Sequence, residues 1–106
     1  MSAELTVIST SRETTIKISG DFDFDINLDF KSAYRSLLPE MAAAARRAFV
    51  VDMGEVERID SAGLGMLLVM LEHAKRQASE VVLLNPTAKV QSILEMVHFN
   101  RLFTIH

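Results

Sequence analysis

The stretch FVVDMGEVERIDSAGLGMLLVML, residues 49–71, decides the fold of this chain. Its first residues are aromatic or β-branched and predict a strand over 48–52, followed by a turn at Asp52 and Gly54. From Gly63 onward the apolar residues recur at helical spacing and predict a helix; they are Gly63, Met66, Leu67, Met70, Leu71, Ala74 and Ala78. The stretch therefore predicts a buried strand, a loop and a helix.

Asp60 and Ser61 are residue types that favour the start of a helix, and we expect Ser61 to cap this one. A capping serine accepts a hydrogen bond from a backbone N–H one turn into the helix, which contributes about 1 kcal/mol. The same position lies beside unpaired N–H groups and the positive end of the helix dipole, where a phosphate can be held. Ser61 is therefore either a simple cap or a group placed for phosphate chemistry.

The rest of the chain alternates strand and helix signals. Residues 5–8 and 15–18 form a predicted hairpin, in which Gly20 ends the second strand. The apolar spacing from Asn27 predicts a helix that Pro39 ends or breaks, with a short helical segment over 41–47. Further elements are expected as a strand at 81–84, a helix that Asn85 caps and Pro86 opens, and a last strand at 102–105. This order predicts an α/β fold with a mixed sheet of four to five strands and helices packed against it.

The composition of the chain excludes several classes of function. The length of 106 residues fits one domain, and the net charge of −3 argues against nucleic-acid binding. Cysteine is absent, so disulfides and thiolate metal sites are excluded, which suits a cytoplasmic protein. No apolar run is long enough to span a bilayer, and the N-terminus lacks the features of a signal peptide.

The loop Asp60-Ser61-Ala62-Gly63-Leu64-Gly65 after a Val-Val-Asp strand resembles the signature loop of STAS domains, in particular the bacterial anti-sigma factor antagonists. Two further segments resemble that family in the same order. Residues 18–23 resemble its Gly-x-Φ-Asp turn, and residues 83–86 with Val90 resemble its last strand-to-helix passage. The resemblance spans most of the chain and implies a single STAS domain over residues 1–106.

The resemblance implies a phosphorylation switch. Ser61 matches the family's phosphoacceptor, and Asp23 matches an aspartate that lies near it. The unphosphorylated form would bind an anti-sigma factor that is also a serine kinase, a metal-dependent serine phosphatase would reset the switch, and no cofactor is implied. The partner-binding surface expected on this basis comprises Asp21, Asp23, Asp60, Ser61, Ala62, Gly63, Leu64, Gly65 and Leu68.

Two leucines of this surface lie away from the apolar stripe of the helix. Leu64 and Leu68 either form a partly exposed docking face beside Ser61 or are simply buried, because a helix that is apolar all round is usually core. Phe22 and Phe24 are likewise expected in the core, with a recognition surface as the alternative. Gly63 and Gly65 are expected to keep the first turns of the helix uncrowded for a close approach.

Other functions fit less well. Asp21, Asp23 and Asp25 begin like a calcium loop, but Ile26 occupies its glycine position and Ser32 its glutamate position. Asp52 has the place of a receiver-domain phosphoacceptor, without the acidic pair and the lysine that such a site needs. His73, His98 and His106 show no metal-ligand spacing, and no catalytic motif is present, so we expect no enzyme. A STAS adaptor for another signalling protein and a nucleotide-binding STAS module stay open as alternatives.

Overall fold

The computed structural model describes residues 3–10, 13–43, 48–76 and 79–106. In chain order the elements are β1 (Glu4–Ser9), β2 (Glu13–Phe22), the 3-10 helix η1 (Phe24–Ile26), α1 (Asn27–Ala43), β3 (Ala48–Ile59), α2 (Ser61–Arg76), β4 (Glu80–Leu84), α3 (Ala88–Met96), the 3-10 helix η2 (Phe99–Arg101) and β5 (Thr104–Ile105).

The five strands form one mixed sheet in the order β1-β2-β3-β4-β5. β1 and β2 pair antiparallel, as the predicted hairpin requires, and every later pair is parallel. The parallel pairs follow from the helices between the strands, because a crossover returns the chain to the same end of the sheet. The predicted mixed α/β sheet is confirmed.

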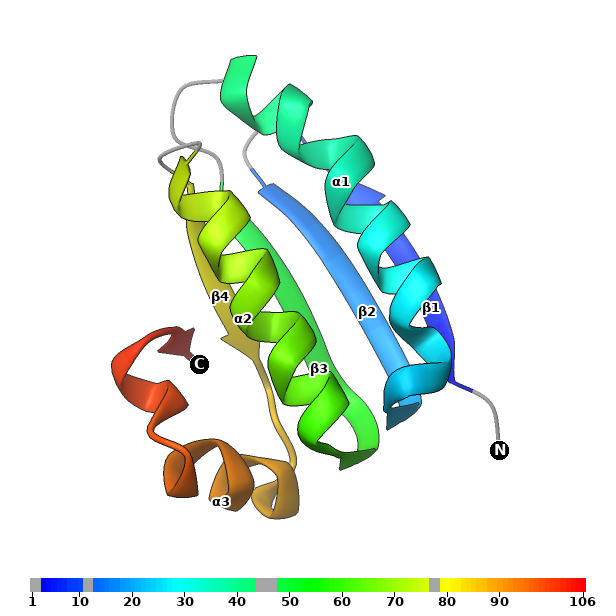
Figure 1. The fold of residues 1–106 in the computed structure, drawn as a ribbon, viewed down its shortest axis with the longest axis vertical. Helices are drawn as coiled ribbons and strands as arrows, with labels where there is room; N and C mark the ends of the chain where they lie inside the picture. The colour runs from blue at the N-terminus through cyan, green and yellow to red at the C-terminus, as the bar shows by residue number, and fades with distance from the viewer. Residues whose placement is uncertain (1–2, 11–12, 44–47, 77–78) are drawn as a thin grey trace.

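Helices α1 and α2 lie side by side over one face of the sheet (Figure 1). Strand β2 shows the resulting alternation: Ile16 and Ile18 are fully buried in the core, whereas Lys17 and Ser19 on the other face are partly exposed. Both helices begin at the end of the sheet where β2 and β3 finish (Figure 1). This end brings together the segments that the sequence marked as functional.

The expected turn after Asp52 is wrong, because β3 continues through Gly54 to Ile59. The paired register jumps from Lys17–Asp52 to Ser19–Glu55, so that β3 carries one extra residue at this point. The Asp52 carboxylate accepts a hydrogen bond of 3.0 Å from the Gly54 N–H. Gly54 therefore marks a bulge within a long strand, which is a common role of glycine in a sheet.

Gly20 likewise does not end β2. The strand continues to Phe22, and a second register shift follows Gly20, whose backbone has a φ of 87°. This left-handed conformation is readily adopted by glycine and lets the strand bend without ending. The extension of both strands carries Asp21 and Arg58 into the sheet.

The expected break at Pro39 is also wrong, because α1 runs as one helix from Asn27 to Ala43. The residues around Pro39 are strong helix formers, mostly leucine and alanine, which offset part of the cost of an interior proline. Of the helical segment expected over 41–47, residues 41–43 belong to α1, and residues 44–47 lie outside the described residues.

The last elements are shifted relative to the sequence prediction. Thr87, not Asn85, caps α3, and its Oγ1 accepts a hydrogen bond of 3.3 Å from the Val90 N–H. Asn85 has a φ of 54°, so it forms the sharp turn between β4 and the helix. The last strand is limited to Thr104–Ile105, because the N–H groups of Leu102 and Phe103 donate to the Phe99 carbonyl at 3.0 and 2.9 Å as part of the preceding turn.

Candidate functional site

The start of α2 is capped by Asp60, not by Ser61. The Asp60 carboxylate accepts a hydrogen bond of 2.8 Å from the Gly63 N–H, and its backbone carbonyl accepts one of 3.0 Å from the Leu64 N–H. Asp60 thus has the N-cap position, where aspartate is among the preferred residues, and Ser61 is the first helical residue. The predicted capping role of Ser61 is therefore wrong.

Ser61 is exposed at the entrance of the helix. Since Asp60 supplies the cap, the Ser61 hydroxyl is not needed to hold the helix end. The first N–H groups of a helix have no intrahelical acceptor, and the dipole gives that end a partial positive charge. Ser61 is thus accessible to a modifying enzyme or a docking partner, at the positive end of the helix dipole.

The two glycines of the loop differ in their surroundings. A Cβ on Gly63 would lie 2.3 Å from the Phe22 carbonyl oxygen and 2.9 Å from Cγ1 of Ile59, whereas one on Gly65 would meet nothing within 4 Å. Gly63 therefore allows the first turn of α2 to press against the end of β2. The close approach expected at Gly63 exists, but it is made by the protein's own backbone.

Three of the expected acidic residues meet at this end of the sheet. Asp21, Asp23 and Asp60 line one shallow hollow of about 270 Å³, together with Arg58 and Ile59. The Asp60 N–H donates a hydrogen bond of 3.4 Å to the Phe22 carbonyl, which ties the start of α2 to the end of β2. The structure thus brings the Asp-rich turn and the Ser61 loop together, although 39 positions separate Asp21 from Asp60 in the sequence.

Arg58 is the residue of this hollow that sequence reasoning missed. Its Nε lies 3.9 Å from Oδ1 of Asp21, and the arginine side chain is largely exposed. A strand that ends in a turn at Asp52 and Gly54 gives Arg58 no partner, and only a continuous β3 places Arg58 opposite Asp21. With three carboxylates beside one guanidinium, the hollow is acidic overall.

The apolar residues at this end of the molecule differ in how far their side chains are exposed. Leu64 is partly buried against the core, and Leu68, one turn further along α2, is 41% exposed. Phe22 is fully buried, as expected, and its ring packs 5.1 Å from that of Phe30. The expectation of a buried Phe24 is wrong, because its side chain is 69% exposed.

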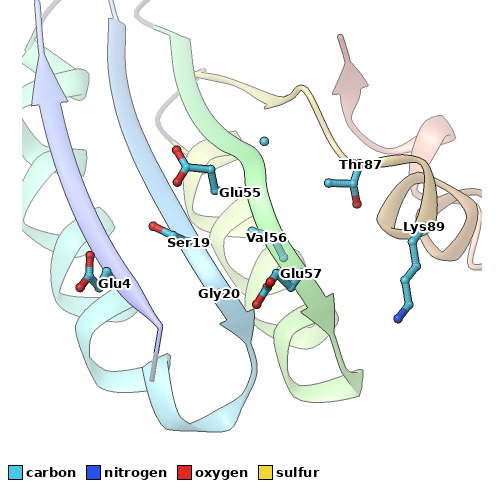
Figure 2. A pocket seen from close by; sticks show the side chains of 9 residues that line it. Glu4, Ser19, Gly20, Glu55, Val56, Glu57, Thr87 and Lys89 are labelled. Carbon is cyan, nitrogen blue, oxygen red and sulfur yellow. The ribbon is translucent and has the colours of Figure 1, made fainter. Parts of the chain in front are cut away.

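A larger hollow of about 680 Å³ lies on the opposite face of the sheet, between the strands and α3 (Figure 2). Carboxylates from β1 and β3 and the Lys89 side chain of α3 surround it; the lining residues are Glu4, Ser19, Gly20, Gly54, Glu55, Val56, Glu57, Thr87 and Lys89. It contains none of the residues that the sequence singled out as functional. Across this face, the Lys17 ammonium pairs with Glu55 at 2.6 Å, and this hydrogen bond raises the pKa of Lys17.

A buried tyrosine lies between the two long helices. Tyr34 of α1 is 1% exposed, and its ring packs against Phe30 and His73. Within the described part of the chain, its hydroxyl has no hydrogen-bond partner, and burial raises its pKa above the usual value of 10.0.

The described residues contain no cluster of three or more potential metal ligands, and none of their helices has the length and hydropathy of a membrane span.

A five-stranded mixed sheet with two helices across one face and a loop of small residues at the start of α2 defines the STAS class of domains. The sequence profile described as "Mlab, STAS domain" matches residues 5–104, and this chain belongs to that family. It is 38% identical over 94 residues to a STAS-domain containing protein of Pseudomonas aeruginosa, covering 89% of this chain and 88% of the relative. It is 31% identical over 85 residues to the intermembrane phospholipid transport system binding protein MlaB of Escherichia coli, covering 77% of each.

Solved structures of low sequence identity share the fold. The anti-sigma factor antagonist SpoIIAA in its unphosphorylated form has a TM-score of 0.74 at 14% identity, over 97% of this chain and 87% of that one. An anti-sigma factor antagonist of Mycobacterium paratuberculosis has a TM-score of 0.76 at 20% identity, over 99% and 86% of the two chains. The STAS resemblance is thereby confirmed, while the antagonist subtype is one of several represented among the relatives.

Proposed function

We propose that this protein is a non-enzymatic binding subunit that docks on another protein of a phospholipid transport system through the Ser61 end of α2. The observation that carries the proposal is the similarity to MlaB, whose name describes the binding protein of such a system, over most of both chains. The description of the matched family also names that protein. Among the functions considered from the sequence, this corresponds to the STAS adaptor.

The geometry supports docking at this end. The surface is formed by Asp21, Asp23 and residues 60–65 with Leu68, and it combines an exposed hydroxyl, an acidic hollow and an exposed leucine. Gly63 allows α2 to pack closely against β2, and the Asp60 cap holds the first turn of the helix, so the surface is formed within the folded chain itself. A preformed surface loses less conformational freedom on binding, which favours affinity.

Ser61 is proposed as the regulatory position of this surface. Phosphorylation adds about −1.5 to −2 charges at neutral pH. A phosphate about 5 Å from a carboxylate, at an effective dielectric near 20, is repelled by about 3 kcal/mol per unit-charge pair. The helix dipole offsets about 0.3–2 kcal/mol of this repulsion. An apolar partner surface packed over Ser61 would have to desolvate the phosphate and loses roughly a hundredfold in affinity or more.

A second candidate is an anti-sigma factor antagonist controlled by the same serine. It is favoured by the exposure of Ser61 at the first helical position and by the shared fold of SpoIIAA, which is described in both an unphosphorylated and a phosphorylated form. In this case the partners would be an anti-sigma factor with serine kinase activity and a metal-dependent serine phosphatase. Both candidates use one surface and differ in the protein that covers it.

The experiment is a pull-down from lysate of the source cells with Ser61→Ala and Ser61→Asp baits, read by quantitative mass spectrometry. Ser92→Asp is the matched control, because Ser92 is also an exposed helical serine but lies on α3. We expect proteins of a phospholipid transport system with the Ser61→Ala and Ser92→Asp baits and a strong reduction with Ser61→Asp.

Recovery of a kinase-type anti-sigma factor in the same pattern would instead establish the second candidate. If all three baits recover the same partners equally, Ser61 is not part of the docking surface, and both versions of the switch are wrong.

A further inference from the structure

The segment Asp21–Asp29 carries an exposed apolar knob, which we define as the side chains of Phe24 and Leu28. Phe24 is 69% exposed and Leu28 is 75% exposed, although both lie within two turns of the fully buried Phe22 and Phe30. Phe24 lies in η1 and Leu28 in the first turn of α1, so both exposed side chains belong to one short helical segment. A concentration of large exposed apolar side chains marks interaction sites in soluble proteins.

In the sequence, carboxylates flank the two residues of the knob. The segment reads DFDFDINLD and contains Asp21, Asp23, Asp25 and Asp29 with no lysine or arginine. Its charge of −4 exceeds the net charge of −3 of the whole chain. Asp21 is near Arg58, and Asp23 is engaged as the cap of η1, whereas Asp25 and Asp29 are exposed.

We propose that this knob docks into an apolar pocket rimmed by lysine and arginine on a partner protein. The occupant follows from charge complementarity: an apolar surface provides the affinity, and opposite charges at the rim select the partner and speed association. A membrane surface does not fit, because anionic headgroups would repel the carboxylates. A second copy of the same knob is disfavoured for the same reason, since eight aspartates would face one another.

The knob extends the surface proposed around Ser61, because Asp21 and Asp23 line the same hollow as Asp60. The inference rests on the proposed function only for the identity of the partner. The chemistry that the knob recognises can be tested without knowing that protein, so the two proposals fail independently.

The test uses the full chain and a synthetic amphipathic helical peptide of leucine and lysine as the probe. A leucine and glutamate peptide with the same apolar pattern is the control for the peptide charge. Affinity is measured by titration calorimetry at two salt concentrations, and the site is located by NMR chemical-shift changes along the protein backbone. We expect the lysine peptide to shift residues around 21–31, to bind more weakly at high salt, and to bind far better than the glutamate peptide.

Two variants separate the apolar and the ionic contributions. Phe24→Ala with Leu28→Ala should weaken the lysine peptide by roughly tenfold or more, since it removes the exposed anchors. Asp25→Asn with Asp29→Asn should weaken it by roughly fivefold and flatten the salt dependence. The matched controls are Met96→Ala, which removes another large apolar side chain that is 77% exposed, and Glu57→Gln, which removes an exposed carboxylate from β3; both should bind like the wild type.

The inference is overturned if the knob variants bind as tightly as the two controls, if the glutamate peptide binds equally well, or if the shifts lie around Met96. These outcomes leave the Ser61 proposal standing, because none of them involves that residue. A circular dichroism melt of each variant confirms that the chain is folded in every titration.

Discussion

Gly63→Ala tests how the start of α2 is held against the sheet. The new methyl carbon would lie 2.3 Å from the Phe22 carbonyl oxygen and 2.9 Å from Ile59 Cγ1, whereas ordinary contacts begin at 3.4 Å. The first turn of α2 must therefore move by about 1 Å, the difference between 3.4 and 2.3 Å. The carbonyl belongs to a strand and cannot rotate away.

The magnitude follows from two opposing effects. Overpacking of this kind costs about 1–3 kcal/mol and occasionally more. Alanine in place of glycine in a helix returns up to about 1 kcal/mol. We expect a net loss of about 2 kcal/mol, because the shift also strains the 3.4 Å hydrogen bond between the Asp60 N–H and the Phe22 carbonyl.

Gly65→Ala is the matched control. It lies in the same turn of α2, and its added methyl group would meet nothing within 4 Å, so it should stabilise the fold by about 0.5–1 kcal/mol. The assay is urea unfolding followed by circular dichroism. With a slope of about 1–3 kcal/mol per molar urea, the two midpoints should differ by about 1–3 M. If Gly63→Ala is as stable as Gly65→Ala, the close packing of α2 on β2 is wrong.

Three further substitutions test the cap of α2 and the buried tyrosine. Asp60→Ala should lower the free energy of unfolding in urea by about 1 kcal/mol, because it removes the cap. Ser61→Ala should change it by less than about 0.5 kcal/mol. Equal losses would return the capping role to Ser61. Tyr34→Phe should raise stability by about 1 kcal/mol, because it removes a buried hydroxyl with no partner among the described residues, and a loss would reveal a hydrogen bond. Burial raises the pKa of Tyr34 in the folded state. The free energy of unfolding of the wild type should therefore be intact below about pH 10 and fall as the pH rises further. This fall should be smaller in Tyr34→Phe.

The main fold elements could be predicted because their signals are local. Alternating and helical hydrophobic patterns placed the hairpin, the central strand and helix α2, and the order of elements then implied the mixed sheet. The boundaries failed where long-range pairing overrides local preference. Gly54 looks like a turn in isolation, but β2 supplies a pairing partner on its far side, so the chain forms a bulge and continues to Ile59.

The candidate site was predicted in outline and missed in its details. The loop at the start of α2 and the Asp-rich turn were identified separately, and only the folded chain shows that they share one hollow. Both Asp60 and Ser61 are good caps, so sequence alone could not decide which one occupies that position. The exposure of Phe24 was not predictable from its own pattern either, because the core is already filled by Phe22, Ile26 and Phe30 from the same segment.

In the proposed function, a partner protein covers the Ser61 end of α2. The most direct measurement is site-specific photo-cross-linking in the source cells, with a photoreactive phenylalanine analogue at Leu68 and, as the control, at Met96, which is more exposed and lies on α3. We expect Leu68 to cross-link to a protein of a phospholipid transport system and this product to be lost when Ser61→Asp is added. Met96 should give no such product. A cross-link that forms equally from Met96, or that persists unchanged with Ser61→Asp, would contradict the proposed function.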